Sequence, residues 1–160
     1  MNYKHKISTV SKANKSKGFT LIEILVVIGI IAILATVVLV AVNPARQFKL
    51  AHDSQRVANI NAILNAIGQN IAENKGIWTC HVGATPLPPG LTDIGTNPNL
   101  DIADCLVPAY IAALPVDPVM GLWNNVTNYD TGYKVSQDAT TGSVTVVAST
   151  ELSGPVQVTR

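Results

Sequence analysis

Residues 15–42 read KSKGFTLIEILVVIGIIAILATVVLVAV, and this stretch decides how the rest of the chain can fold. Glu23 is its one acidic residue, and the 19 residues from Ile24 to Val42 carry no charge. A helix of about 20 apolar residues crosses the ~30 Å hydrocarbon core of a bilayer. The stretch therefore predicts a membrane helix with one carboxylate near its start, where an ionised acid is costly unless a cation pairs with it.

The charges before this helix predict its orientation in the membrane. Lys and Arg gather on the cytoplasmic side of membrane helices, so residues 1–18 are expected inside and residues after about 43 outside. Removing residues 1–18 takes the formal charge from +1 to −4, because they hold five lysines and no acid. A mildly acidic exported part argues against a nucleic-acid surface built on net charge. The five lysines are Lys4, Lys6, Lys12, Lys15 and Lys17.

The order of these features differs from that of a secretory signal peptide. A signal peptide has its small-residue cleavage site after an apolar core of about 7–15 residues. Here Gly18 precedes a longer core, and no A-x-A pattern follows that core. Cleavage at Gly18 would remove the basic segment and keep the apolar helix, which indicates a different kind of processing signal.

The junction Lys17-Gly18-Phe19-Thr20-Leu21-Ile22-Glu23 resembles the class III leader junction of type IV pilins and type II secretion pseudopilins. The resemblance is strongest over about residues 15–75. It implies cleavage between Gly18 and Phe19 by a prepilin peptidase, and methylation of the new Phe19 amine by the same enzyme. It further implies that the partners are an inner-membrane assembly platform, the lipid bilayer before assembly, and other copies of the chain.

The same resemblance gives Glu23 a role in assembly. In pilin-like filaments, the Glu five residues into the mature chain is expected to meet the terminal ammonium of a neighbouring subunit, here that of Phe19. Such pairing would make a buried carboxylate tolerable. The alternative is that Glu23 lies at headgroup level, where an acid suits the positive end of the helix dipole.

The helical pattern continues beyond the membrane segment after an interruption at Asn43-Pro44. Proline lacks an N–H and disfavours helical geometry at the residue before it, so either a kink or a break is expected. Apolar residues then recur at spacings of seven, three, four, three and four, which predicts an amphipathic helix over residues 45–74. Gly76 is expected in the C′ position, the first residue past the cap that ends the helix. The stripe is Leu50, Val57, Ile60, Leu64, Ile67 and Ile71.

This stripe needs a cover, which residues 77–160 must supply. Residues 133–137 and 143–149 read as strands joined by a hairpin at 138–142. Residues 156–159 indicate a further short strand, whose start Pro155 confines to a sheet edge or a strand end. We expect this antiparallel sheet to cover the stripe from Val57 to Ile71. A coiled coil is the alternative, but the stripe spans only about three heptads without clear flanking charge pairs.

The segment between helix and sheet holds both cysteines. Residues 79–104 are rich in Pro and Gly and read as a loop, and residues 106–114 suggest a short helical turn before Pro115. An even cysteine count in an exported segment predicts a Cys80–Cys105 disulfide, with two buried free thiols as the alternative.

No catalytic or cofactor motif was found, and no metal site is predicted. The segment Leu114-Pro115-Val116-Asp117-Pro118, followed later by Tyr133, resembles a part of major pseudopilins, a group that often carries a calcium site. The acids of this region nevertheless lack the tight alternating spacing of a calcium loop. They are Asp101, Asp104, Asp117, Asp130 and Asp138.

Together these patterns predict an α+β protein with a long N-terminal helix packed on a small C-terminal antiparallel sheet. The expected parts are a cleaved leader at 1–18, a membrane and assembly helix at 19–42, an amphipathic helix half at 43–75, and an exported head at 76–160. The predicted function is that of a structural, non-enzymatic subunit of a pilin-like filament, first held in the inner membrane. Surface pilus, secretion pseudopilus and DNA-uptake filament all stay open. The rival is a binding domain tethered outside the membrane by a single helix.

Overall fold

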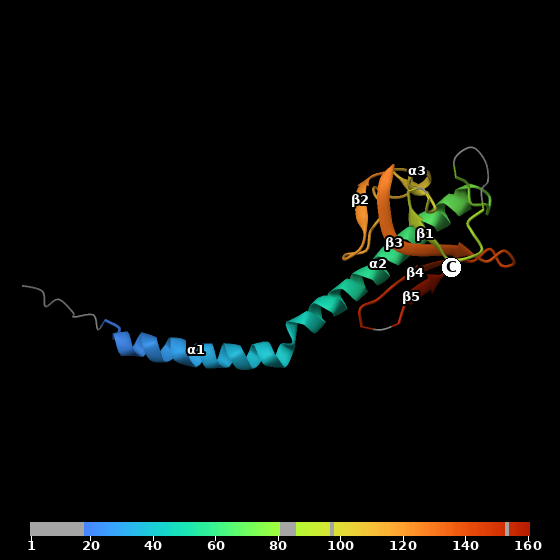
Figure 1. Ribbon diagram of the computed structural model, residues 1–160. Coiled ribbons are helices and arrows are strands. Elements are labelled where there is room, and N and C mark those ends of the chain that lie inside the picture. Colours follow the sequence, from blue (N-terminus) through green and yellow to red (C-terminus); the bar gives the residue numbers. More distant parts are fainter. Residues whose placement is uncertain (1–17, 81–85, 97, 153) are drawn as a thin grey trace, which may run out of the picture. The chain divides into compact units, whose positions relative to one another are not determined.

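The computed structural model describes residues 18–80, 86–96, 98–152 and 154–160. The chain forms two compact units, one ending at Asn43 and one beginning at Pro44, and each is described by itself. The expected leader at 1–18 lies outside the described residues apart from Gly18. Figure 1 shows the order of the elements along the chain.

The first unit consists of helix α1, Leu21–Val42, which is 22 residues long. Within the chain it buries none of its side chains. In the described part of the chain it is the one helix that is long and apolar enough to cross a membrane. It ends at Asn43, whose backbone is left-handed with φ 44°.

The second unit starts with helix α2, Pro44–Glu73, which confirms the helix expected over 45–74. Pro44 takes the first helical position, where its missing N–H costs no hydrogen bond. Of the two outcomes expected at Asn43-Pro44, the structure therefore has the break. At the other end the predicted place of Gly76 was wrong by one residue, because the first residue beyond the helix cap is Lys75 (φ 59°) and Gly76 follows it. The Gly76 N–H donates to the carbonyl of Ile71 at 2.8 Å, closing the helix end.

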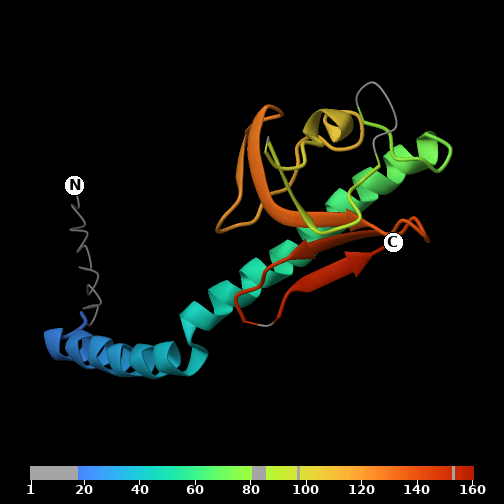
Figure 2. The same ribbon diagram turned by 45° about the vertical axis from the view of Figure 1, so that its right-hand side comes forward.

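A five-stranded antiparallel sheet covers one face of α2 (Figure 2). The strand order is β1-β3-β4-β5, and β2 pairs with the beginning of β3. The long strand β3 and the hairpin to β4 confirm the two predicted strands, and β5 confirms the predicted edge strand. The strands are β1 (Thr92–Gly95), β2 (Leu122–Asn125), β3 (Asn128–Gln137), β4 (Val144–Ala148) and β5 (Val156–Thr159).

The core lies between α2 and this sheet. Inward side chains alternate along β3 and β4, as the period of a half-buried strand requires. Each large aliphatic side chain removed from water stabilises the fold by ~1.5–3 kcal/mol. The α+β class, with the amphipathic helix on an antiparallel sheet, is therefore confirmed. The principal core residues are Ile60, Ile63, Ile67, Tyr129, Tyr133, Val135 and Val146.

The predicted face of α2 was wrong at its first turns. Val57 is 39% exposed, whereas its neighbour Arg56 is 2% exposed and lies in the core. The buried face therefore follows Arg56, Ile60, Ile63 and Ile67. A charged residue takes the buried position because it finds a carboxylate there, as described below.

Two short strands and the position of the short helix were also missed. β1 lies inside the segment predicted as loop, because Asp93 and Gly95 are weak strand formers and pairing with β3 supplies its stability. β2 is similarly short and held by β3. The helical turn expected within 106–114 is instead α3, Ala103–Leu106. It ends before Pro108, which disfavours helical geometry at Val107.

Candidate functional site

The start of α1 holds the predicted processing and assembly residues. Thr20 is the N-cap, and its hydroxyl oxygen accepts the Glu23 N–H at 3.2 Å. The Glu23 carboxylate in turn accepts the Thr20 N–H and the Thr20 hydroxyl, each at 3.1 Å. This reciprocal capping box satisfies backbone donors that the first turn of a helix leaves without partners.

The capping box brings the Glu23 carboxylate back towards the residue that precedes the helix cap. Phe19 is 83% exposed in the chain, and Gly18 has nothing within 4 Å of where a Cβ would lie. The structure thus places an acid in the first turn of an apolar helix. The predicted cleavage residues, Gly18 and Phe19, lie in the exposed segment just before this helix. The pairing of Glu23 with a neighbour's Phe19 stays a prediction.

The two cysteines form a disulfide in the head. Cys80 follows α2 and Cys105 lies in α3, with their Cα atoms 5.1 Å apart and their positions separated by 25 in the sequence. The predicted pairing is thus present. Asp104 lies close to both sulfurs, but sulfur atoms that are bonded to each other do not act as thiolate ligands, so this group does not make a metal site.

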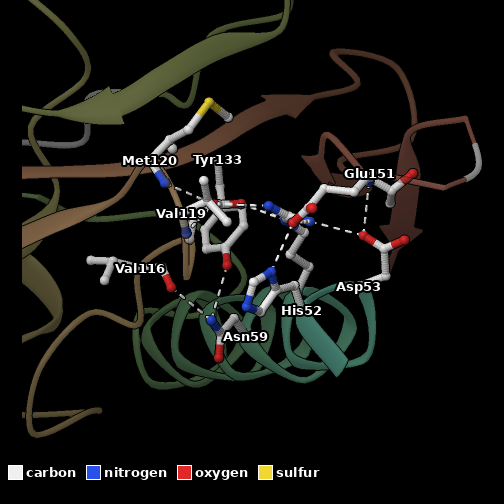
Figure 3. Close-up of polar contacts among 12 residues, drawn as sticks. His52, Asp53, Asn59, Val116, Val119, Met120, Tyr133 and Glu151 are labelled. Carbon is white, nitrogen blue, oxygen red and sulfur yellow. Dashed lines mark hydrogen bonds and ion pairs between the residues drawn. The ribbon is translucent and has the colours of Figure 1, made fainter. Parts of the chain in front are cut away.

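A cluster of ion pairs centred on the buried Arg56 connects α2 to two loops of the head. Figure 3 shows its outer members His52, Asp53 and Glu151. Arg56 Nε and Nη2 donate to the two carboxylate oxygens of Asp117 at 2.6 and 3.1 Å. Its Nη1 donates to Asp53 at 2.8 Å and to Glu151 at 3.3 Å. Glu151 also lies 2.8 Å from His52 Nδ1. These five residues are called the Arg56 cluster below.

The charges of the cluster shift the pKa values of its members. Burial raises the pKa of Asp117, but hydrogen bonds from Arg56 and from two backbone N–H groups outweigh burial and hold it below its ordinary value. The hydrogen bond to Asp117 raises the pKa of Arg56. A backbone N–H of Glu151 lowers the pKa of Asp53. The buried Arg56 guanidinium thus has a carboxylate partner for each of its nitrogens, as a buried charge requires.

Asp117 also organises the turn that follows it. Its Oδ1 accepts the N–H groups of Val119 and Met120 at 2.9 and 3.0 Å, and its carbonyl accepts the Gly121 N–H at 3.0 Å. A Cβ on Gly121 would lie 2.5 Å from the Asp117 nitrogen, so only glycine fits there. One buried carboxylate thus fixes both the core pair and the surface turn.

The sequence patterns did not predict this cluster. Asp117 appeared there within the pseudopilin-like segment and among several scattered acids, without a partner, and Arg56 was not singled out. A signal was present, because Arg56 lies four residues before Ile60 and Asn70 three residues after Ile67, in the spacing of the buried face. Asn70 shows how such a residue is tolerated, since its amide exchanges two 3.0 Å hydrogen bonds with the Thr79 backbone.

Two features define a pilin-like protein. One is an apolar N-terminal helix with a Glu in its capping box, and the other is a second helix packed on a small antiparallel sheet. Comparison with known proteins supports this class. The prokaryotic N-terminal methylation motif matches residues 13–39. The type II secretion system core protein G of Escherichia coli strain K12 is 34% identical over 114 residues, covering 70% of each chain. The chain belongs to the type IV pilin and type II secretion pseudopilin family. No solved structure matches it.

Proposed function

We propose that this chain is the precursor of a filament subunit, and that the filament is a type II secretion pseudopilus. Residues 1–18 are removed by a prepilin peptidase and the Phe19 amine is methylated. The mature subunit is first held in the inner membrane, with α1 in lipid and the head on the extracytoplasmic side. It then polymerises through α1. The named relative, a type II secretion core protein, favours the pseudopilus over a surface pilus.

The observation that carries this proposal is the surface of α1. All of its side chains are exposed in the chain, although only Glu23 and Thr36 among them are polar. In the monomer, lipid keeps this apolar surface away from water. In a filament, other copies of α1 do the same, because the packing of apolar helices also removes this surface from water.

Glu23 is the feature that distinguishes these two environments. In the monomer its carboxylate completes the capping box with Thr20. In the filament, the methylated ammonium of a neighbour's Phe19 would add an opposite charge to this carboxylate. The attraction between the two charges grows as neighbouring helices exclude water. This pairing favours assembly and fixes the axial register of the subunits.

The rival proposal is a head tethered by a single membrane helix. A tether requires an apolar helix, but it gives no reason for Gly18-Phe19 before the helix or for an acid in its first turn. The capping box alone is a weaker explanation, since Gln serves the same position without a charge.

Mass spectrometry of the mature N-terminus separates the two proposals. Purified membrane protein should yield an N-terminal peptide that begins with methylated Phe19. A tethered domain should instead retain Met1 or begin at a later residue. Extracellular or periplasmic material sheared from the same cells should contain filaments of this chain.

A further inference from the structure

The Arg56 cluster supports a turn that exposes apolar side chains. Val119 and Met120 are 59% and 61% exposed, and Leu122 follows them on the surface. Residues 118–122, called the apolar turn below, contain no charged or hydrogen-bonding side chain. Exposed apolar residues that gather in one place mark interaction sites more often than scattered ones do.

The backbone of the apolar turn is held in place from below. Asp117 is 1% exposed, its carboxylate binds Arg56, and its N–H donates to the Thr131 carbonyl at 2.8 Å. Gly132 approaches Asp117 so closely that a Cβ there would lie 2.9 Å from the Asp117 Cβ. A turn that is already ordered loses little conformational entropy on binding. Methionine at its tip also adapts well to an apolar site.

The same head contains a hollow with matching chemistry. This hollow of about 440 Å³ lies between the first half of α2 and the loop that joins β4 to β5. Three polar residues line the hollow, which are Arg46, Asp53 and Ser54. The rest of the lining is apolar and consists of Leu50, Val57, Leu152 and Val156. The unexpected exposure of Val57 is thus part of an apolar depression on the head.

The Arg56 cluster fixes the hollow as well as the turn. Arg56 binds Asp117 on one side and Asp53 on the other. Asp53 accepts the N–H groups of Glu151 and Leu152 at 2.9 and 3.3 Å, which positions the β4–β5 loop. Figure 3 shows Val119 and Met120 at one end of the cluster and Asp53 and Glu151 at the other.

We propose that the apolar turn of one copy docks in the hollow of a second copy of this chain. The inference rests on the proposed function, because a filament needs a contact between two different patches that repeats without closing. In a single chain the turn stays exposed and the hollow stays open. Each subunit therefore offers both halves of one head-to-tail contact.

The charges agree with this occupant. The apolar turn brings no charge into the hollow. Asp53 already binds Arg56 and two backbone N–H groups, and Arg46 also has a partner in the chain. Docking therefore buries apolar surface while Asp53 keeps its ion pair with Arg56, and a buried charge that keeps its partner avoids the cost of an unpaired one.

The first test compares filament yield from full-length chains expressed with the secretion machinery. Met120→Glu should lower the yield about tenfold or more, because it places a charge in an apolar contact. Ile77→Glu is the matched control, since Ile77 is 56% exposed and lines neither patch, and it should assemble like the wild type. Resistance of Cys80 and Cys105 to alkylation should show that each head is folded.

Restoration by a second charge makes the test specific. Leu152→Lys added to Met120→Glu places a lysine in each hollow opposite the new glutamate, and the yield should recover. Normal filaments from Met120→Glu alone, or no recovery in the double variant, would overturn the docking. Absence of filaments from the wild type would contradict the proposed function, and with it a docking that needs a second copy.

Cross-linking identifies the occupant directly. Two differently tagged chains, one with Met120→Cys and one with Leu152→Cys, should form a mixed disulfide dimer in assembled filaments. Met120→Cys with Ile77→Cys should not. Equal cross-linking in both pairs, or capture only of a different protein by Met120→Cys, would contradict docking on a second copy.

Discussion

Arg56 and Asp117 are 61 positions apart in the sequence, and their side chains form a two-pronged ion pair in the core of the head. The pair joins α2 to the loop that precedes β2. Such pairs rarely add net stability over an apolar core, but losing one partner leaves a buried charge behind. The pair therefore specifies where the loop lies more than it stabilises the head.

Substitution of one partner should be costly, and substitution of both should be less so. We expect Asp117→Asn to lower the free energy of unfolding by ~3 kcal/mol, the lower end of the range for a broken buried pair, since Arg56 keeps Asp53 and Glu151. Arg56→Met combined with Asp117→Asn should be more stable than Asp117→Asn alone. Urea unfolding of the mature chain in detergent, followed by the fluorescence of Trp78 and Trp123, measures this. Equal loss in both variants would contradict the role of the uncompensated charge.

The stability of the head should depend on acid through the same carboxylate. The pKa of Asp117 lies below its ordinary value of 3.8 in the folded chain. Its contribution is complete above pH ~3.8 and is lost as the pH falls through the folded pKa, because the unfolded chain takes up the proton first. As the pH falls below about 4, the free energy of unfolding should decrease more steeply in the wild type than in Asp117→Asn. Parallel curves would show that Asp117 does not carry the dependence.

The disulfide should be complete in mature protein. Alkylation without reduction should label neither Cys80 nor Cys105, whereas labelling of both would contradict the bond. Replacement of both by serine should lower the free energy of unfolding by ~3 kcal/mol, the chain-entropy value for a loop of this size.

The length of each pattern decided how well the sequence predicted the structure. The membrane-length helix, α2 and the hairpin from β3 to β4 have long patterns in which propensity and burial agree. β1 and β2 have four residues each and exist because β3 pairs with them, so local sequence contains little sign of them. The partner of Arg56 was equally hidden, because a contact across 61 positions depends on the tertiary fold.

Processing should depend on the size of residue 18. Gly18→Val should leave an uncleaved precursor with residues 1–18 attached. Inside the chain nothing lies within 4 Å of a Cβ at this position, so the substitution should not disturb the subunit itself. Gly18→Ala, which adds one carbon, serves as the graded control. Mass spectrometry of the purified chain measures the cut, and normal maturation of Gly18→Val would contradict the proposed site.

The most direct test of the filament proposal separates the charge of Glu23 from its hydrogen bonds. Glu23→Gln keeps an acceptor for the Thr20 N–H and so keeps the capping box, but it removes the charge that a neighbour's Phe19 ammonium would meet. Thr20→Ala weakens the box and keeps the charge. Glu23→Ala removes both, and Glu23→Asp restores the charge on a shorter side chain.

The decisive measurement is the yield of filaments relative to membrane-bound monomer for each variant. We predict that Glu23→Gln and Glu23→Ala stay in the membrane with folded heads and form almost no filaments. Thr20→Ala should retain much of the yield, and Glu23→Asp should recover part of it. Abundant filaments from Glu23→Gln would contradict the account, because they would show that this acid serves only to cap its own helix.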